Sequence, residues 1–81
     1  MTRDEIFTAL SGYLQEMFEI PAEKIRLEAR LGEDLDLDSI DAVDLVVRLQ
    51  DLTGRKISPE QFKTVRTIGD VVERVHELFV P

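Results

Sequence analysis

Two amphipathic stretches, one near each end of the chain, restrict the possible fold more than any other feature of the sequence. In both, apolar side chains recur every three or four residues, which is the spacing of one face of an α-helix. The first stretch begins after Thr2, which forms a capping-box pattern with Glu5, and ends before Pro21. The second begins at Thr67, with Asp70 three positions later. The apolar stripes are Ile6, Phe7, Leu10, Tyr13, Leu14, Met17 and Phe18 in the first stretch, and Ile68, Val71, Val72, Val75, Leu78 and Phe79 in the second.

Two further helices are predicted between these stretches. A long one runs from about Ser39 to Thr53, and Gly54 is suited to end it. A short one starts at Ser58, where Ser-Pro-Glu-Gln combines an N-cap residue, a proline in the first turn and a capping-box glutamine. The sequence therefore predicts an all-α fold. We expect a small four-helix bundle with a short third helix, formed by residues 1–81 as a single domain.

The connection between the first two predicted helices, residues 19–38, is long for so small a domain. A structureless connection of this length is uncommon and usually has a function. We expect one helical turn near Pro21–Ile25 to shorten it. Aliphatic side chains would turn inward and hold the remainder, and these are Ile25, Leu27, Leu31, Leu35 and Leu37.

The composition excludes several classes of function. The chain contains no cysteine, so it has no disulfide, no thiolate zinc ligand and no thiol of its own. No apolar run approaches the roughly 20 residues that cross a bilayer. Residues 1–5 also lack the apolar stretch of a signal peptide. We therefore expect a cytoplasmic protein that does not insert into membranes, and a monomer, because nothing in the sequence indicates an oligomer.

Negative charge is concentrated in one quarter of the chain. The formal net charge of the whole sequence is −7. Residues 33–52 contain seven acidic residues and one basic residue, Arg48, so this segment alone carries −6. Such a field repels nucleic acid and anionic membranes, and it attracts basic protein surfaces or divalent cations. The expected partners are proteins with basic patches, and no nucleic acid partner is expected.

A single serine, Ser39, stands where the acidic segment meets the long predicted helix. Asp38 is suited to cap this helix, because a carboxylate there accepts a backbone hydrogen bond and faces the positive end of the helix dipole. Ser39 would then be the first helical residue, with its hydroxyl outside the bundle. In isolation, an Asp-Ser pair before an apolar run is most often only a helix start.

Self-contained catalysis by Ser39 is not expected. A serine nucleophile needs an adjacent base, and the neighbourhood of Ser39 offers only carboxylates. The single histidine, His76, lies in the last predicted helix, where a half-buried structural role is expected. The sequence therefore predicts that the chain is not an enzyme and has no catalytic residues.

The acidic segment resembles a calcium-binding EF-hand loop only in part. Asp34, Asp36 and Asp38 match the first, third and fifth positions of such a loop. The sixth position should be glycine and is Ser39, and the twelfth should be glutamate and is Leu45. We therefore predict no specific metal site, although crowded carboxylates allow loose divalent binding.

The long predicted helix is apolar over more than half of its circumference. Its core arc consists of Ala42, Leu45, Val46, Leu49 and Leu52, and its charged ridge of Asp41, Asp44, Arg48 and Asp51. A second apolar arc, Ile40, Val43 and Val47, lies between them and exceeds what a surface helix needs. This arc either packs against a neighbouring helix or forms an apolar strip that docks a partner.

The segment Glu33-Asp-Leu-x-x-Asp-Ser-Ile-Asp-x-Val-Asp-Leu-Val resembles the signature of acyl carrier proteins. The likeness covers essentially the whole chain. It implies that Ser39 carries 4′-phosphopantetheine, donated by coenzyme A and attached by a magnesium-dependent phosphopantetheinyl transferase. The arm would hold acyl intermediates as thioesters. The chain would present them to acyl-transferring, condensing or acyl-activating enzymes of fatty-acid, polyketide or related lipid biosynthesis.

The resemblance also implies two further groups of residues. The docking surface for basic patches of partner enzymes would comprise Asp38, Ile40, Asp41, Val43, Asp44 and Val47. The acyl chain would slip between the helices, against Val46, Leu49, Leu52, Val65, Val71 and Val75. The alternative function is that of an unmodified acidic adaptor, whose second helix docks basic proteins while Ser39 merely begins a helix.

The sequence departs from the family pattern at three places. Asp36 stands where the family often has glycine, Arg48 interrupts the acidic ridge, and residues 50–56 replace the usual acidic continuation of the second helix. The resemblance with these departures favours a specialised carrier for one pathway over a housekeeping role in fatty-acid synthesis.

Overall fold

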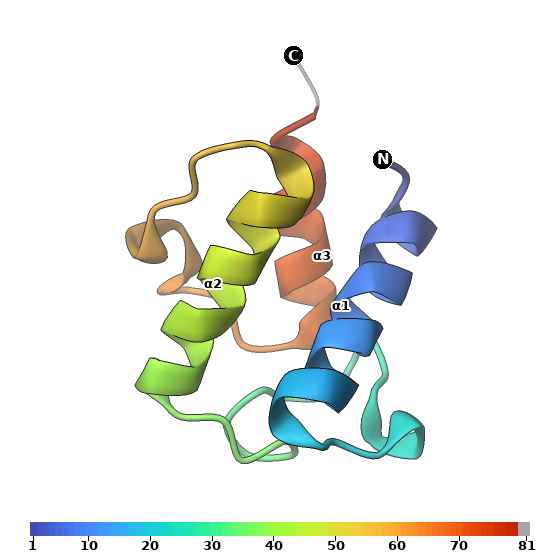
Figure 1. The fold of residues 1–81 in the computed structure, drawn as a ribbon. Coiled ribbons are helices and arrows are strands. Elements are labelled where there is room, and N and C mark those ends of the chain that lie inside the picture. Colours follow the sequence, from blue (N-terminus) through green and yellow to red (C-terminus); the bar gives the residue numbers. More distant parts are fainter. Residues whose placement is uncertain (80–81) are drawn as a thin grey trace.

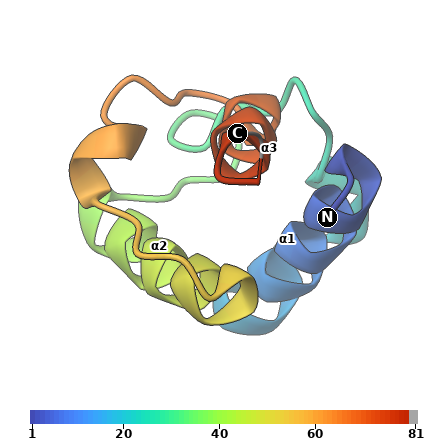
Figure 2. The same ribbon diagram turned by 90° about the horizontal axis from the view of Figure 1, so that it is seen from above.

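The computed structural model describes residues 1–79 as three α-helices joined by connections that contain two 3₁₀ helices (Figure 1). The elements, in chain order, are α1 (Arg3–Phe18), η1 (Ala22–Lys24), α2 (Ser39–Thr53), η2 (Pro59–Phe62) and α3 (Ile68–Glu77). Viewed from above, α1 and α2 form a V, and α3 lies across its open side (Figure 2). The helix η2 lies on the side of α2 that is remote from α1 (Figure 2).

The helices begin where side chains satisfy the free N–H groups of the first turn. In α1, Thr2 Oγ1 accepts a hydrogen bond from the Glu5 N–H at 3.2 Å, and Glu5 Oε1 accepts one from the Thr2 N–H at 2.8 Å. Thr67 begins α3 and Ser58 begins η2 with the same reciprocal arrangement. These predicted helix starts are confirmed, as is the end of α2 at Gly54, which adopts φ 66°.

The expected fourth helix of the bundle is present only as η2, a single 3₁₀ turn. Residues 63–66, between η2 and the cap Thr67, are not helical and lead the chain into α3. Runs of 3₁₀ helix longer than three or four residues are uncommon in any case, because their hydrogen-bond geometry is poor. The all-α prediction is confirmed, since the described residues contain no strand and only one isolated β-bridge, Arg30 with Thr67. The bundle itself has three α-helices.

The core is formed by the predicted stripes of α1 and α3 together with one face of α2. Burying an aliphatic side chain of this size stabilises the fold by about 1.5–3 kcal/mol. The side chains from these helices with 5% exposure or less are Ile6, Leu10, Leu14, Leu45, Val46, Leu49, Ile68, Val71, Val72 and Val75. At the surface, an exposed ion pair joins α1 to α3, with Arg3 Nε 2.7 Å from Glu73 Oε1.

The connection 19–38 is held against α3 by backbone hydrogen bonds. The Leu31 N–H donates to the Arg66 carbonyl at 2.9 Å, and the Ile68 N–H donates to the Ala29 carbonyl at 3.0 Å. The expected helical turn near Pro21–Ile25 is present as η1. The long connection is therefore an ordered part of the fold.

One of the predictions for the buried side chains of this connection is wrong. Ile25 and Leu35 are buried, and Leu31 and Leu37 pack partly buried against the core, but Leu27 is 52% exposed. Pairing with the start of α3 fixes which side chains of the connection face inward, and this places Ala29, with 6% exposure, in the core. A pattern of hydrophobic residues alone does not reveal such a pairing.

The start of α3 lies so close to the connection that a side chain at Gly69 would be crowded. The Gly69 N–H donates to the Leu27 carbonyl at 2.8 Å, and a Cβ added at Gly69 would lie 3.0 Å from that same oxygen. By contrast, a Cβ added at Gly12 in the middle of α1 would meet nothing within 4 Å. A methyl group added at position 69 would therefore press against the connection, whereas one added at position 12 would contact nothing.

We expect Gly69→Ala to lower the free energy of unfolding by about 1 kcal/mol, because the new methyl group must push the connection away from α3. The matched control Gly12→Ala should raise it by about 0.5–1 kcal/mol, because alanine favours a helix interior over glycine. Urea denaturation of both variants measures these changes. A Gly69→Ala variant as stable as the wild type would show that this approach is not tight.

The stability that Asp70 gives to the start of α3 depends on pH. Its Oδ2 accepts hydrogen bonds from the Arg66 N–H at 3.0 Å and from the Thr67 N–H at 3.1 Å. The backbone bond from Arg66 is the largest of the effects that lower the pKa of the Asp70 carboxyl, followed by the bond from Thr67. Because the folded pKa lies below the unfolded one, this stabilisation is present above the unfolded pKa of about 3.9. It is lost as the pH falls through the lower, folded pKa.

We therefore expect Asp70→Asn to lose less stability than the wild type when the pH falls from 5 to 3. Urea denaturation at each pH gives the slope of unfolding free energy against pH for both proteins. Asp51→Asn is the control, because it removes an exposed carboxylate of α2 that accepts no hydrogen bond among the described residues. Equal slopes for the Asp70 variant and the wild type would contradict the assignment.

Candidate functional site

The acidic loop meets α2 at a capping box made of two aspartates. Asp38 Oδ1 accepts a hydrogen bond from the Asp41 N–H at 2.9 Å, and Asp41 Oδ2 accepts one from the Asp38 N–H at 3.2 Å. Asp38 was predicted as the cap, but the structural role of Asp41 was not. The signal for it was the Asp-x-x-Asp spacing, which reproduces the capping-box pattern with a shorter acid at the second position.

This box makes Ser39 the first residue of α2, with an exposed side chain. Within the described part of the chain, no side chain or backbone group forms a hydrogen bond with the Ser39 hydroxyl. The hydroxyl is therefore accessible to a reagent that approaches from solvent. Each adjacent carboxylate accepts a hydrogen bond from a backbone N–H group, and neither accepts one from the Ser39 hydroxyl.

Two apolar hollows begin at Ser39. The inner one, of about 240 Å³, extends between α2, α3 and the end of the long connection. The outer one, of about 280 Å³, is a groove between α2 and η2. Ser39, Ala42, Val46 and Phe62 line both. An apolar group attached to Ser39 would thus find apolar walls on two sides.

The residues that the sequence suggested for an acyl pocket fall into two sets. Val46, Leu49, Val65 and Val71 line the inner hollow. Leu52 and Val75 are not among the described residues that line it. Val75 is buried in the core, and Leu52 packs partly buried against the core. The sequence reasoning did not assign six other lining residues to the pocket, and these are Leu31, Gly32, Leu37, Ala42, Leu45 and Phe62.

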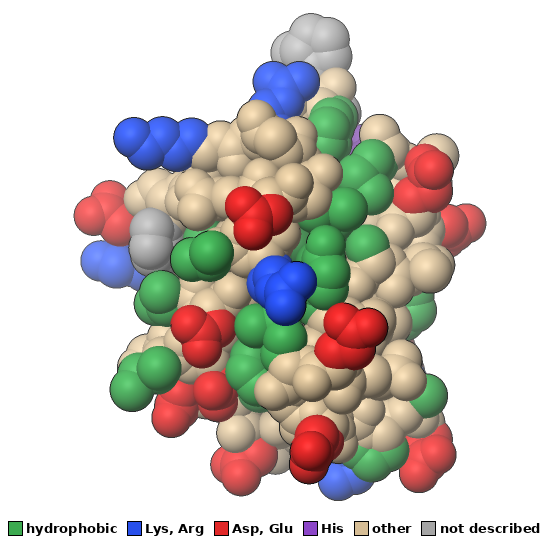
Figure 3. Space-filling view, viewed as in Figure 1, with side chains coloured by type: hydrophobic (Ala, Val, Ile, Leu, Met, Phe, Trp, Pro, Cys, Tyr) green, Lys and Arg blue, Asp and Glu red, His purple; other side chains and the backbone are tan. Residues whose placement is uncertain are grey.

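The second apolar arc of α2 faces solvent. Ile40 is 72% exposed, Val43 46% and Val47 49%, so none of them packs into the core. Figure 3 shows apolar side chains among acidic ones over this part of the surface. Val43 also lines the outer groove together with Phe62 of η2, so of the three only this side chain faces a neighbouring helix in that groove, and the arc as a whole remains open to a partner.

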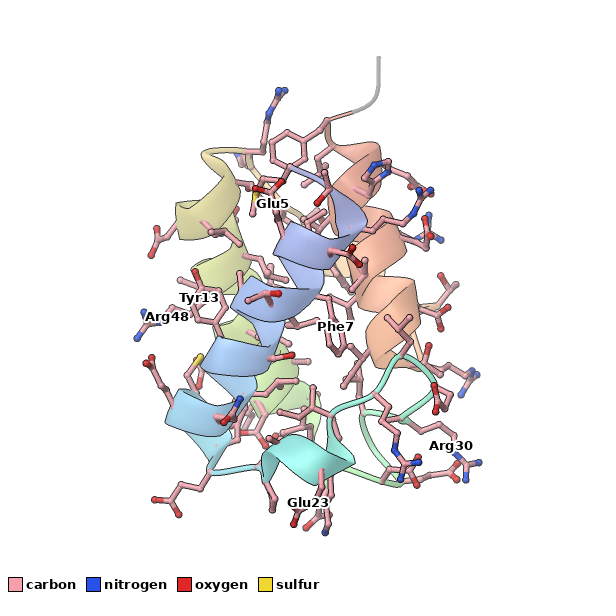
Figure 4. The ribbon with its side chains drawn as sticks, turned by 90° about the vertical axis from the view of Figure 1, so that its right-hand side faces the viewer. Glu5, Phe7, Tyr13, Glu23, Arg30 and Arg48 are labelled. Carbon is pink, nitrogen blue, oxygen red and sulfur yellow. The ribbon has the colours of Figure 1, made fainter. Side chains whose placement is uncertain are left out.

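Arg48 interrupts the acidic ridge but points toward α1. Its guanidinium carbon lies 5.8 Å from the centroid of the Tyr13 ring, within the range of a cation–π interaction (Figure 4). The arginine therefore contributes to the contact between α1 and α2. The ridge near Ser39 keeps its negative charge, with Asp44 exposed and Asp41 half-buried.

Part of the negative charge of the acidic segment is neutralised within the loop. Arg30 Nη1 lies 2.6 Å from Glu33 Oε2, and Arg30 Nε lies 3.6 Å from Asp34 Oδ2. The Arg30 N–H also donates to Asp34 at 2.8 Å, and this backbone bond is the main cause of the lowered pKa of Asp34. The uncompensated charge is thus concentrated at Asp36, Asp38, Asp41 and Asp44, closer to Ser39 than the sequence count suggested.

Residues 1–79 offer no candidate for two other features, a metal site and a membrane-spanning helix. They contain no group of three or more His, Cys, Asp or Glu side chains arranged to hold a metal ion. Nor do they include a helix that is long and apolar enough to span a bilayer. His76 is half-buried in α3, remote in sequence from the Ser39 segment.

An exposed serine thus stands at the start of an acidic helix, with apolar hollows beside it. Residues 8–75 match the family model described as the phosphopantetheine attachment site. The chain belongs to the acyl carrier protein family. It is a carrier of acyl groups on a 4′-phosphopantetheine prosthetic group, and not a catalyst.

Named relatives and solved structures agree with this assignment. Acyl carrier protein 2 of Ralstonia nicotianae is 53% identical over 78 residues, which cover 96% of each chain. The acyl carrier protein of Saccharopolyspora erythraea is 42% identical over 78 residues, covering 96% of this chain and 82% of that one. The crystal structure of the acyl carrier protein from Thermotoga maritima superposes with a TM-score of 0.79 at 25% identity, covering 93% of this chain and 87% of that chain.

The departure at Asp36 has a structural explanation. Asp36 adopts a left-handed conformation with φ 56°, a region that favours glycine and that aspartate tolerates better than most residues. A glycine at this position would adopt the same backbone conformation without strain. The aspartate adds a negative charge to the loop that leads to Ser39.

The two roles of Asp41, capping and charge, can be separated by substitution. We expect Asp41→Ala to lower the free energy of unfolding by about 0.5–1.5 kcal/mol, because the Asp38 N–H loses its acceptor. Asp41→Asn should cost less, since the amide oxygen still accepts that bond. Asp44→Ala, which removes a carboxylate without a capping role, should change stability by no more than about 0.5 kcal/mol. Urea denaturation tests the order, and equal costs for the alanine and asparagine variants at position 41 would contradict the capping role.

Proposed function

We propose that Ser39 is the residue that carries the 4′-phosphopantetheine arm, and that the arm loads and delivers acyl groups as thioesters. The observation that carries this proposal is the position of Ser39, an exposed hydroxyl at the first position of α2 that lines both apolar hollows. The arm would also supply the thiol that a chain without cysteine lacks.

Attachment would proceed by attack of Ser39 Oγ on the phosphorus of coenzyme A that bears the pantetheine. A new P–O bond forms to Oγ, the bond to the other phosphate breaks, and adenosine 3′,5′-bisphosphate leaves. The proton of the hydroxyl needs a base. Since neither Asp38 nor Asp41 accepts a hydrogen bond from the Ser39 hydroxyl, we assign that base to the phosphopantetheinyl transferase.

The docking surface for the transferase and for acyl-handling enzymes is proposed to consist of Asp38, Ile40, Asp41, Val43, Asp44 and Val47. Support comes from the exposure of the three apolar members and from the uncompensated carboxylates between them. An apolar strip bordered by charge is a typical docking surface. Electrostatic attraction to basic patches would speed encounter and weaken with salt, which suits a shuttle that must leave each enzyme after its turn.

The inner hollow is proposed as the binding site of the acyl chain. Its walls are mostly aliphatic side chains, including Val46, Leu49, Val65 and Val71, and Ser39 lies at its edge. Of the residues first suggested for the pocket, Leu52 and Val75 would contact the lining residues from the core side. The hollow would keep water from the cargo, while the thioester remains near the surface.

We further propose a specialised role in one lipid or polyketide pathway, rather than general fatty-acid synthesis, and a single-domain cytoplasmic monomer. The departures at Asp36, Arg48 and residues 50–56 support the specialised role, because they alter the charge pattern around α2. The unmodified adaptor is not favoured, because the matching family is defined by phosphopantetheine attachment.

The test is co-expression with a phosphopantetheinyl transferase, followed by intact-mass measurement. The wild type should gain one phosphopantetheine increment and Ser39→Ala none, because that variant lacks the accepting oxygen. Asp41→Asn, which keeps the serine and the capping bond, should still be modified but more slowly at low salt, because the docking surface has lost a charge. A wild type that stays unmodified with several transferases, or a modified Ser39→Ala, would overturn the assignment.

A further inference from the structure

One aromatic side chain borders every hollow around η2. Phe62 lines the inner hollow of about 240 Å³ and the outer groove of about 280 Å³, both of which begin at Ser39. It also lines a third hollow of about 490 Å³, which lies between η2 and the second half of α3 and does not include Ser39. Phe62 is therefore the common wall between the space that starts at Ser39 and the larger space beyond η2.

The backbone around Phe62 is held at both ends. Before η2, the Ile57 N–H donates to Gln50 Oε1 of α2 at 2.8 Å. After η2, Arg74 Nη2 of α3 donates to Thr64 Oγ1 at 3.2 Å. The Phe62 carbonyl itself accepts from the Val65 N–H at 3.1 Å. The part that is free to move is thus the side chain of Phe62 rather than the turn that bears it.

A side chain that borders open space on three sides can rotate at low cost. Interior side chains are normally held by contacts on all sides, and each adjoining void removes some of those contacts. Phe62 is only half-buried, in contrast to the fully buried Leu49 and Val71 that share the inner hollow with it. Rotation of its ring would join the inner hollow to the space beyond η2.

We propose that Phe62 is the specificity-determining residue that limits the length of acyl chain this carrier shelters. With the ring in place, the chain fills the inner hollow and its remaining carbons stay in solvent. A smaller side chain at position 62 opens a path from the inner hollow toward Ile57 and Leu78, the aliphatic members of the third hollow. The other walls of that hollow are polar or charged, so the added carbons would lie along these two side chains; the polar walls are Glu60, Gln61, Thr64, Arg74 and Glu77. The inference rests on the proposed function, because it places the acyl chain on Ser39.

The test uses a series of acyl forms of increasing length, made by loading the wild type and each variant from the corresponding acyl-coenzyme A with a phosphopantetheinyl transferase. Two properties are measured for each length: the rise in melting temperature over the unacylated holo form, and the rate at which hydroxylamine cleaves the thioester. In the wild type both should stop changing beyond a limiting length. In Phe62→Ala the melting temperature should keep rising, and the cleavage rate keep falling, for several carbons beyond that limit.

Two further substitutions control for the possibility that Phe62→Ala acts through a general loss of packing. Phe62→Trp should shift the limit to shorter chains, in the direction opposite to Phe62→Ala, because it enlarges the wall. Val72→Ala removes bulk from a buried position of α3 that lines none of the three hollows, so it should lower the melting temperature without moving the limit. If Phe62→Ala proves too unstable, Phe62→Leu should give a smaller shift in the same direction.

The failures of the two proposals are distinguishable. A wild type that gains no mass from any acyl-coenzyme A would overturn the function proposed for Ser39. Loaded proteins whose limiting length is the same in the wild type, Phe62→Ala and Phe62→Trp would overturn the role of Phe62 while leaving Ser39 as the attachment residue. An equal shift in Val72→Ala would show that general loosening, and not position 62, sets the limit.

Discussion

The reciprocal hydrogen bonds between Asp38 and Asp41 determine where α2 begins, and the rest of the site depends on that point. Without the box, the first turn of α2 would lose its capping bonds, and Ser39 would lose its fixed position at the start of the helix. Burial of Leu45, Val46 and Leu49 sets the orientation of the rest of α2, and this orientation keeps Ile40, Val43 and Val47 at the surface. The box therefore fixes the Ser39 hydroxyl relative to the core contact and the apolar strip.

The same two carboxylates serve structure and recognition. Each lies at the positive end of the α2 dipole, which lessens the cost of placing negative charges close together. Each also keeps one oxygen that the box does not use, since Asp38 accepts through Oδ1 and Asp41 through Oδ2. A basic partner can bind the remaining oxygens without breaking the cap. Arg30, by pairing with Glu33 and Asp34, confines the available negative charge to this end of the helix.

Much of the fold, and the position of Ser39 at the start of α2, could be predicted from sequence because they depend on local patterns. Capping residues and apolar stripes act over a few positions, so Thr2, Thr67 and Gly54 were recognisable as helix boundaries. The features that escaped prediction depend on contacts between distant segments. Leu27 is exposed because the connection pairs with the start of α3, and Phe62 lines the hollows only because η2 lies beside both α2 and α3.

The pairing of the long connection with α3 has a consequence for how the molecule accommodates its load. Hydrogen bonds from Leu31, Ile68 and Gly69 fasten the connection to the start of α3, and α3 in turn packs along α1. These three parts form a stiff frame. On the opposite side, α2 is linked to that frame mainly by side-chain contacts, whereas hydrogen bonds hold the segment around η2 at both ends. A longer acyl chain would therefore widen the protein only on the side of α2. A partner bound to α2 could then distinguish the loaded carrier from the unloaded one by the displacement of this helix.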